Sequence, residues 1–273
     1  MDTRPIGVFD SGLGGLTVVR QLLEQLPGED IVYFGDTGRV PYGTRSRETI
    51  EKYARQDCRF LLGKDVKQII AACGTVSSTA LHVLEGLPVP ACGVVEATAA
   101  AAVKASRSGR IGVMGTSATI RSGAFPRRIE TLRPGAQVFS AACSMLIPLV
   151  ENGWIDPDDE VARAILHRYL APLKAEGVDT LILGCTHFPL LAPLISAEMG
   201  ETVRLIDSGQ ETAAACAAAL AARQALNPTK KRGSCRFYVS DRVEGFSQIA
   251  HIFLGREVED DVEMVELEAI DHI

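Results

Sequence analysis

The chain has 273 residues, of which 47% are hydrophobic and 23% are charged. At about 150 residues per domain, this length suits one large domain or two modest ones, which can bury a core without disulfides or structural metals. Its 34 acidic and 28 basic residues give a formal net charge of −6, which argues against a general nucleic-acid-binding protein.

The N-terminus and the cysteines indicate a reduced, cytoplasmic protein. Residues 1–5 lack the charged head and apolar stretch of a secretory signal. The alanine-rich stretches at 97–102 and 213–222 are too short to span a membrane. The seven cysteines are an odd number and include no C-x-x-C pair, so neither a disulfide framework nor a zinc knuckle is expected.

Short β-branched runs alternate along the chain with longer helical patterns, which is typical of parallel sheets covered by helices. The sequence predicts strands over residues 5–9, 31–34, 68–72, 110–114, 180–183, 203–206 and 236–239. It predicts helices that include residues 17–26, 47–62, 157–176 and 212–225. The acidic run 257–268 is expected to be a polar, exposed ending. No proline-rich or serine-rich linker is visible, so two domains would have to pack tightly and exchange chain.

Two pairs of segments resemble each other and suggest an internal duplication. Residues 4–11 resemble residues 110–117, and residues 69–75 resemble residues 181–186. The second pair carries Cys73 and Cys185, each directly after an apolar strand. Ligands of α/β folds bind outside the carboxyl ends of strands. Two halves that face each other would therefore direct both thiols into one cleft.

The two cysteines are the strongest candidates for chemistry. Cys73 precedes a hydroxyl-rich run at a predicted helix N-terminus, where the helix dipole is expected to lower the pKa of the thiol. Cys185 has a similar setting, with Thr186 and His187 after it. A single such cysteine is more often a small buried hydrophobe. Two in matching frames instead favour a two-base racemase or epimerase, in which one sulfur removes a proton and the other returns one on the opposite face.

Other kinds of active site account for Cys73, Cys185 and His187 less well. A cysteine hydrolase would pair Cys185 with His187 and leave Cys73 without a role. A zinc site at Cys185 and His187 lacks a second pair of ligands. The glycines at 12, 14 and 15 do not fit the dinucleotide-binding fingerprint, and no P-loop lysine is present. We therefore expect no metal and no nucleotide.

Two glycine-containing loops follow the first two predicted strands. Residues 10–16 would form either an anion-binding cradle of backbone N–H groups or a turn capped by Asp10 or Ser11. Residues 34–43 mark a second turn at the same sheet edge, where Tyr42 would line the rim or simply pack there.

Three polar side chains are candidates to assist the thiols. Asp10 lies near Cys73 by its position at a strand end, and His187 lies near Cys185 in the same way. The alternatives are a capping carboxylate and a hydrogen-bonded structural histidine. Glu151, after an apolar run, is a third candidate, with a solvated helix residue as the alternative.

Several stretches resemble the glutamate racemase family. These are residues 7–16, 33–36 with 41–43, and 184–190, which recur in the family's order across nearly the whole chain. Residues 151–154 resemble the segment that carries the family's assisting glutamate. The resemblance implies a cofactor-independent isomerase that interconverts L- and D-glutamate for peptidoglycan synthesis. It also implies two pseudosymmetric α/β domains with parallel sheets and an active site in the cleft between them.

The resemblance further implies roles for single residues. Cys73 and Cys185 would be the two acid/base thiols. Asp10 would assist Cys73, while His187 and Glu151 would assist on the Cys185 side. The substrate would be held by Asp10, Ser11, Tyr42, Gly43, Gly74, Thr75, Thr116, Thr119, Thr186 and His187.

The domain limits and the assembly follow from the same resemblance. The domain that carries Cys73 would comprise residues 1–97 and 208–273, and the domain that carries Cys185 would comprise residues 98–207. Family members are commonly homodimers, and no membrane or nucleic-acid partner is expected.

Gly74 departs from the family's usual Cys-Asn-Thr at the first thiol. An asparagine would offer the substrate a side-chain amide, and losing one hydrogen bond to a charged group costs about 1.5–3 kcal/mol. We therefore expect weaker binding or a different preferred amino acid, which keeps a racemase for another substrate such as aspartate as a second hypothesis. A family member with a binding role, such as gyrase inhibition, is a third, although the two intact thiols argue against lost catalysis.

Overall fold

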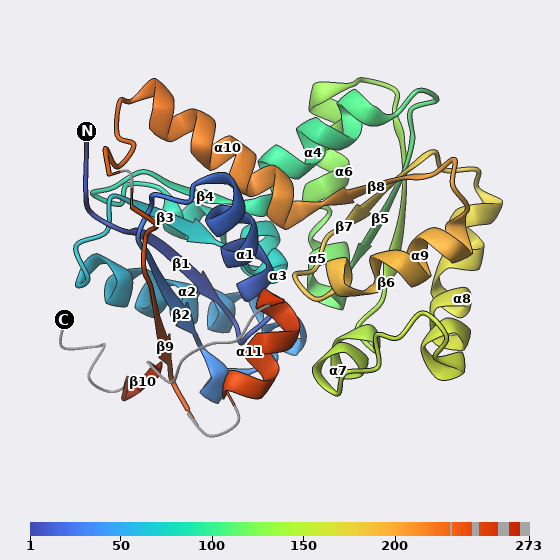
Figure 1. The fold of residues 1–273 in the computed structure, drawn as a ribbon. Coiled ribbons are helices and arrows are strands. Elements are labelled where there is room, and N and C mark those ends of the chain that lie inside the picture. The colour runs from blue at the N-terminus through green and yellow to red at the C-terminus, as the bar shows by residue number, and fades with distance from the viewer. Residues whose placement is uncertain (230, 242–245, 256–261, 268–273) are drawn as a thin grey trace.

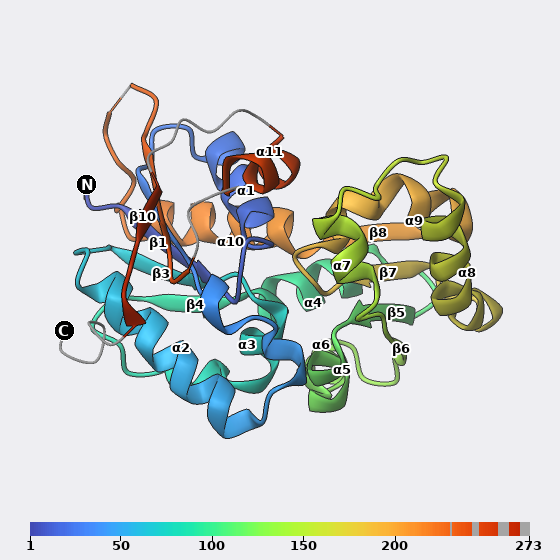
Figure 2. The same cartoon turned by 90° about the horizontal axis from the view of Figure 1, so that it is seen from below.

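The computed structural model describes residues 1–229, 231–241, 246–255 and 262–267. Two parallel sheets stand side by side, each covered by helices (Figures 1 and 2). We call the six-stranded sheet with its helices the first lobe and the four-stranded sheet with its helices the second lobe. No helix in the described residues combines the length and the apolar character needed to cross a membrane.

The sheet of the first lobe has the strand order β10-β9-β2-β1-β3-β4. Its strands are β1 (Ile6–Asp10), β2 (Ile31–Gly35), β3 (Gln68–Ala71), β4 (Ala91–Gly93), β9 (Cys235–Val239) and β10 (Val262–Met264). The sheet of the second lobe has the order β6-β5-β7-β8. Its strands are β5 (Arg110–Gly115), β6 (Gln137–Ala142), β7 (Thr180–Leu183) and β8 (Arg204–Asp207).

The two lobes repeat one strand order, as expected from the internal duplication. The first four strands of the chain are arranged as β2-β1-β3-β4, and the next four are arranged in the same way as β6-β5-β7-β8. In this correspondence β1 matches β5, and β3 matches β7. These are the strands that carry the two pairs of similar segments found in the sequence, and the predicted α/β architecture of two related halves is confirmed.

The helices cover both faces of each sheet (Figure 2). In the first lobe α1, α10 and α11 pack together, and α2 lies against the opposite face. In the second lobe α8 packs with α9, and α4 packs with α6. The helices are α1 (Leu16–Gln25), α2 (Arg47–Leu62), α3 (Gly74–Thr79), α4 (Val94–Ala105), α5 (Ser117–Ser122), α6 (Ala124–Leu132), α7 (Leu146–Glu151), α8 (Glu160–Ala175), α9 (Ala192–Met199), α10 (Ser208–Ala222) and α11 (Phe246–Leu254).

The apolar core follows from the alternation of side chains along the strands. In β1, Ile6 and Val8 pack under α1, while Phe9 joins the cluster under α2. In β7, Leu181 packs toward α8 and α9, while Ile182 packs toward α4 and α6. The largest cluster contains residues of both lobes, from Ile6 through Leu181, so the lobes share one core.

The seven strands predicted from the sequence are present, with ends that differ by about one residue. Three strands were not predicted. Of these, β4 and β10 have only three residues each, and β6 is an edge strand with a half-exposed face. The helix predicted at 157 begins at Glu160 because Asp159 accepts a hydrogen bond from the N–H of Ala162. The helix predicted at 212 begins at Ser208 because Asp207 caps it in the same way.

The acidic run at 257–268 differs from the expected exposed ending. Residues 257–261 and 268 lie outside the described residues. Within the described part, β10 (Val262–Met264) pairs in parallel with β9 and extends the sheet. Val265 and Leu267 pack against the apolar cluster under α2. The prediction was wrong for Val262, Val265 and Leu267, which are partly buried against the apolar clusters, whereas Glu263, Met264 and Glu266 are exposed as expected.

Candidate active site

A cavity of about 330 Å³ lies between the lobes, outside the carboxyl ends of β1 and β3 on one side and of β5 and β7 on the other. This is the position expected for a ligand in α/β folds. The first lobe supplies Asp10, Ser11, Gly12, Val40, Pro41, Tyr42, Gly43, Thr44, Cys73, Gly74 and Thr75. The second lobe supplies Thr116, Ser144, Ile147, Pro148, Glu151, Gly184, Cys185, Thr186 and His187.

The cavity brings together the residues singled out in the sequence, with one exception. Thr119 does not line it, because it lies in α5 behind Thr116, whose hydroxyl oxygen is 3.0 Å from that of Thr119. Gly12, Val40, Pro41 and Gly184 also line the cavity; they belong to segments that the sequence placed at this edge without singling these residues out. The lining residues that the sequence did not indicate are Thr44, Ser144, Ile147 and Pro148. The last three lie in or near α7, where nothing in the sequence marked them as facing the cleft.

On the side of the first lobe, the thiol of Cys73 lies at the start of α3. Its sulfur is 3.6 Å from the hydroxyl oxygen of Ser11. Asp10, only 2% exposed, accepts a hydrogen bond of 3.1 Å at Oδ2 from the N–H of Gly12, and its Oδ1 has no partner among the described residues. Burial raises the pKa of Asp10, against the opposing effects of His187 and nearby backbone N–H groups. Asp10 does not cap α1, because that helix begins after Gly15 and no side chain caps it.

The pKa of the Cys73 thiol is shifted opposite to the expectation from the helix dipole. Burial, and secondly the charge of Asp10, raise it to about 12. The hydrogen bonds with the Val76 N–H and with the Ser11 hydroxyl act in the opposite direction but are weaker. The six-residue helix α3 thus does not compensate for the loss of solvent, and Cys73 is held as a neutral thiol.

On the side of the second lobe, Cys185, His187 and Glu151 form a chain. The Cys185 sulfur is 3.7 Å from Nδ1 of His187, and Nε2 of His187 is 3.0 Å from Oε1 of Glu151. Burial acts to lower the pKa of His187, but its hydrogen bonds to Cys185 and Glu151 raise it to about 10. A protonated imidazole carries N–H groups on both nitrogens, one directed to Cys185 and the other to Glu151.

Two neighbours fix the imidazole of His187. The ring of Phe253, from α11, lies 5.2 Å away and is nearly perpendicular to it. On the glycine-rich loop, a Cβ at Gly14 would be 2.6 Å from Nδ1 of His187, so only glycine fits there. The glycines of residues 10–16 therefore allow this loop of the first lobe to approach the second lobe closely.

Hydroxyl groups and backbone provide the remaining polar surface of the cavity. The hydroxyl oxygens of Thr75 and Thr116, from different lobes, are 3.0 Å apart. Tyr42 lines the cavity but its hydroxyl donates to Asp36 and lies 3.1 Å from Asp57, so that group is held in a buried network. Among the described lining residues there is no lysine or arginine. Apart from His187, the donors available to an anionic ligand are thus neutral.

Comparisons with known proteins agree with this geometry. The model of the family described as Asp/Glu/Hydantoin racemase matches residues 6–216. A glutamate racemase of Geobacter metallireducens is 45% identical over 270 residues, which cover 98% of this chain and 99% of that protein.

Solved structures give the same result. A glutamate racemase isoform of Bacillus anthracis has a TM-score of 0.93 at 38% identity, covering 98% of this chain and 99% of that one. The glutamate racemase of Francisella tularensis, solved in complex with D-glutamate, has a TM-score of 0.91 at 37% identity, covering 98% of this chain and 100% of that one.

Proposed function

The chain belongs to the Asp/Glu/Hydantoin racemase family and is a racemase, and we propose that it interconverts L- and D-glutamate by proton transfer at two cysteines. One observation carries the mechanism. Cys73 and Cys185 follow equivalent strands of the two lobes and line one cavity, each with its own polar partner.

In the proposed reaction the α-carbon of glutamate lies between the two sulfurs. The thiolate of one cysteine takes the α-proton, and the bonding electron pair stays on the substrate as a carbanion. The thiol of the other cysteine then protonates the opposite face. Each turnover thus leaves one sulfur with a proton gained and the other with a proton lost, and proton exchange with water restores both before the next turnover. No cofactor takes part.

The two thiols have different polar partners, so different residues assist proton removal in the L-to-D and D-to-L directions. Asp10 assists Cys73, and His187 with Glu151 assists Cys185. The chain from Cys185 to Glu151 leads outward, since the side chain of Glu151 is 46% exposed. The substrate carboxylates are held by neutral donors, namely Ser11, Thr75, Thr186 and the backbone around Gly43 and Gly74.

We also propose that the product D-glutamate serves peptidoglycan synthesis, and that the enzyme acts in the cytoplasm as a homodimer. We propose that one domain comprises residues 1–97 and 208–273 and the other comprises residues 98–207. The two sheets support this division, although α4 (Val94–Ala105) runs through the first limit and packs on both lobes, against α10 of the first and α6 of the second.

The first test uses purified protein, L-glutamate and D₂O without added cofactor, followed by circular dichroism and by NMR of the α-proton. We expect optical activity to disappear while deuterium enters the α-position. Exchange with aspartate but not with glutamate would replace glutamate as the substrate. Absence of exchange across a panel of amino acids, with all thiols reduced, would contradict the proposal and favour a binding role.

Single cysteine variants test the mechanism. Cys73→Ser and Cys185→Ser should each lower kcat by at least about 100-fold, because general acid/base groups contribute that much or more. Cys235→Ser is a matched control, since Cys235 is partly buried at the start of β9 and away from the cavity. Near-normal turnover in either cleft variant, with far-UV circular dichroism unchanged, would exclude the two-thiol mechanism.

A further inference from the structure

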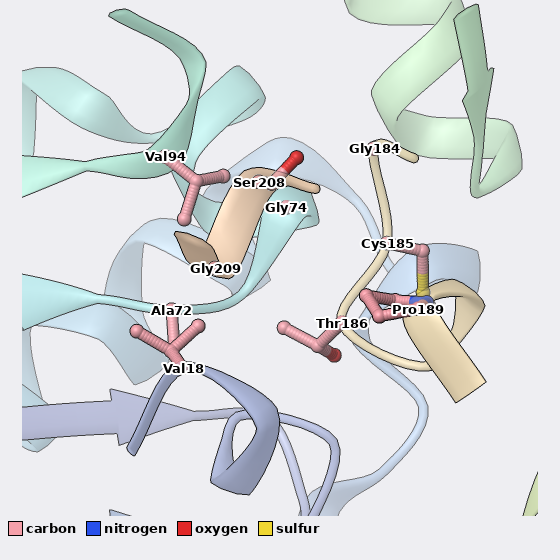
Figure 3. Close-up of a pocket in the computed structure, with 10 residues that line it drawn as sticks. All are labelled: Val18, Ala72, Gly74, Val94, Gly184, Cys185, Thr186, Pro189, Ser208 and Gly209. Atoms are coloured by element: carbon pink, nitrogen blue, oxygen red, sulfur yellow. The ribbon is translucent and has the colours of Figure 1, made fainter. Parts of the chain in front are cut away.

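The two lobes meet directly behind the thiols through very small residues. Figure 3 shows Ala72 and Gly74 of the first lobe near Gly184, Cys185 and Thr186 of the second. These residues are among those that line a void of about 10 Å³. A void of this size holds at most one water molecule, so the contact is nearly filled. We call this contact the seam.

Gly74 is the point of closest approach in the seam. A Cβ built at Gly74 would be 2.4 Å from the carbonyl oxygen of Gly184, in the other lobe. Ordinary contact begins at 3.4 Å, so a side chain would require a displacement of about 1 Å. Gly74 has no left-handed backbone angle, so the requirement for glycine comes from this contact and not from its own conformation.

Neither the Gly184 carbonyl nor the backbone at Gly74 can move away from the contact within its own lobe. The N–H of Gly184 donates to the carbonyl of Met114 at 2.9 Å, and a Cβ on Gly184 would already be 2.6 Å from that oxygen. On the other side, the hydroxyl of Ser77 ties α3 to the carbonyl of Ala71 at 2.9 Å. A side chain at Gly74 would therefore push the lobes apart.

We propose that the backbone contact of Gly74 with Gly184 sets the separation of the two catalytic sulfurs, which makes both glycines positioning residues. The inference rests on the two-thiol function proposed above. Gly74 directly follows Cys73 and Gly184 directly precedes Cys185 in the chain, so lobes wedged apart at this point carry the two thiols apart. A misplacement of about 1 Å between reacting groups can cost about 100-fold in rate.

The spacing role and a missing substrate-binding amide predict opposite effects of Gly74→Asn on activity. If the missing amide limits binding, asparagine should improve kcat/KM. If the contact sets the spacing, both Gly74→Ala and Gly74→Asn should lower kcat, because both add a Cβ at the same place.

The experiment compares wild type, Gly74→Ala, Gly74→Asn and the control Gly209→Ala. Gly209 lies in the same seam, but a Cβ there would stay 3.2 Å or more from its neighbours. For each variant we would measure kcat, KM, thermal unfolding and the isotope effect on kcat with α-deuterated glutamate. We expect both Gly74 variants to lose at least about 10-fold in kcat with a small change in KM. Their isotope effect should rise because proton transfer becomes slower, whereas Gly209→Ala should resemble wild type.

A second variant covers the case in which Gly74→Ala does not fold. Thr17 donates from its hydroxyl to the carbonyl of Thr186 across the seam at 3.0 Å. Thr17→Val removes this bond, and with it the bond of the same hydroxyl to the Gly14 carbonyl, with little change in volume. It should give a smaller fall in kcat with the same rise in isotope effect.

The outcomes separate the two proposals. Unchanged kcat and isotope effect in the folded variants would overturn the spacing role while leaving the racemase function intact, and so would a Gly74→Asn variant more active than wild type. Failure of the wild-type enzyme to racemise glutamate would instead overturn the function itself.

Discussion

Asp10 controls Cys73 through its charge as well as through its position. The carboxylate is buried beside the thiol, and its charge is the second cause, after burial, of the raised pKa of Cys73. Asp10→Asn removes the charge but not the burial. We therefore expect the pKa of Cys73 to fall from about 12 while it stays above that of an exposed thiol. The rate of iodoacetamide labelling against pH, in a Cys185→Ser background, measures this.

The labelling experiment can also contradict electrostatic control of Cys73 by Asp10. An unchanged or higher midpoint in Asp10→Asn would show that Asp10 does not act on the thiol electrostatically. The matched control is Asp30→Asn, at the start of β2 and outside the cavity, where no change in the labelling of Cys73 is expected.

The protonation of His187 couples the active site to stability. Its pKa is raised from 6.5 to about 10 despite burial, by Cys185 and Glu151, so the folded state binds its proton more tightly than the unfolded state. This contribution is complete below pH 6.5 and is lost as the pH rises through about 10. The unfolding free energy of wild type relative to His187→Asn should therefore be largest near pH 6 and decrease toward pH 10. Urea unfolding at several pH values measures it, and a difference that grows with pH would contradict the assignment.

At the residue scale, the sequence predicts placement better than it predicts electrostatics. Asp10 ends β1, and Cys73 and Cys185 come two residues after β3 and β7, which was enough to place them at the carboxyl ends of the strands that face the cavity. The pKa of Cys73 was wrong because the sequence shows the helix start but not the depth of burial. The position of Thr119 behind Thr116 depends on how α5 packs, which no local pattern records.

The loop of residues 36–44, part of which lines the cavity, is anchored to helix α2 by buried charges. Arg39 donates from Nε to Asp36 at 2.6 Å and from Nη2 to Asp57 at 3.3 Å, and both carboxyl groups are fully buried. The pKa of Asp57 is raised well above its usual value by burial and by Asp36. The hydroxyl of Tyr42 joins the same network.

Arg39→Leu should therefore destabilise the protein strongly, because it leaves Asp36 and Asp57 without their cation. We expect a loss of about 3–5 kcal/mol in unfolding free energy. Arg47→Leu, which removes an exposed ion pair with Glu51, should cost less than about 1 kcal/mol. Urea unfolding of both variants measures the difference. Equal effects would mean that the buried network does not hold the loop.

At the scale of elements, the sequence predicts strands with clear apolar runs and helices with strong caps. It did not predict β6, whose outward residues are exposed at a sheet edge, or α4, whose alanine-rich sequence has little polar face. The network around Asp36 was also not predicted, because Asp57 comes from α2 and meets Arg39 and Tyr42 only in the folded chain.

At the scale of the molecule, the shared core predicts that the lobes unfold together. The largest apolar cluster contains residues of both sheets, and the seam adds close backbone contacts between the lobes. The chain has one tryptophan, Trp154, which follows α7 in the second lobe and is 45% exposed. Its fluorescence reports on that lobe, whereas far-UV circular dichroism reports on both. We expect the two signals to give the same midpoint in urea. Two separated midpoints would show that the lobes are independent units, and the seam would then be too weak to fix the distance between Cys73 and Cys185.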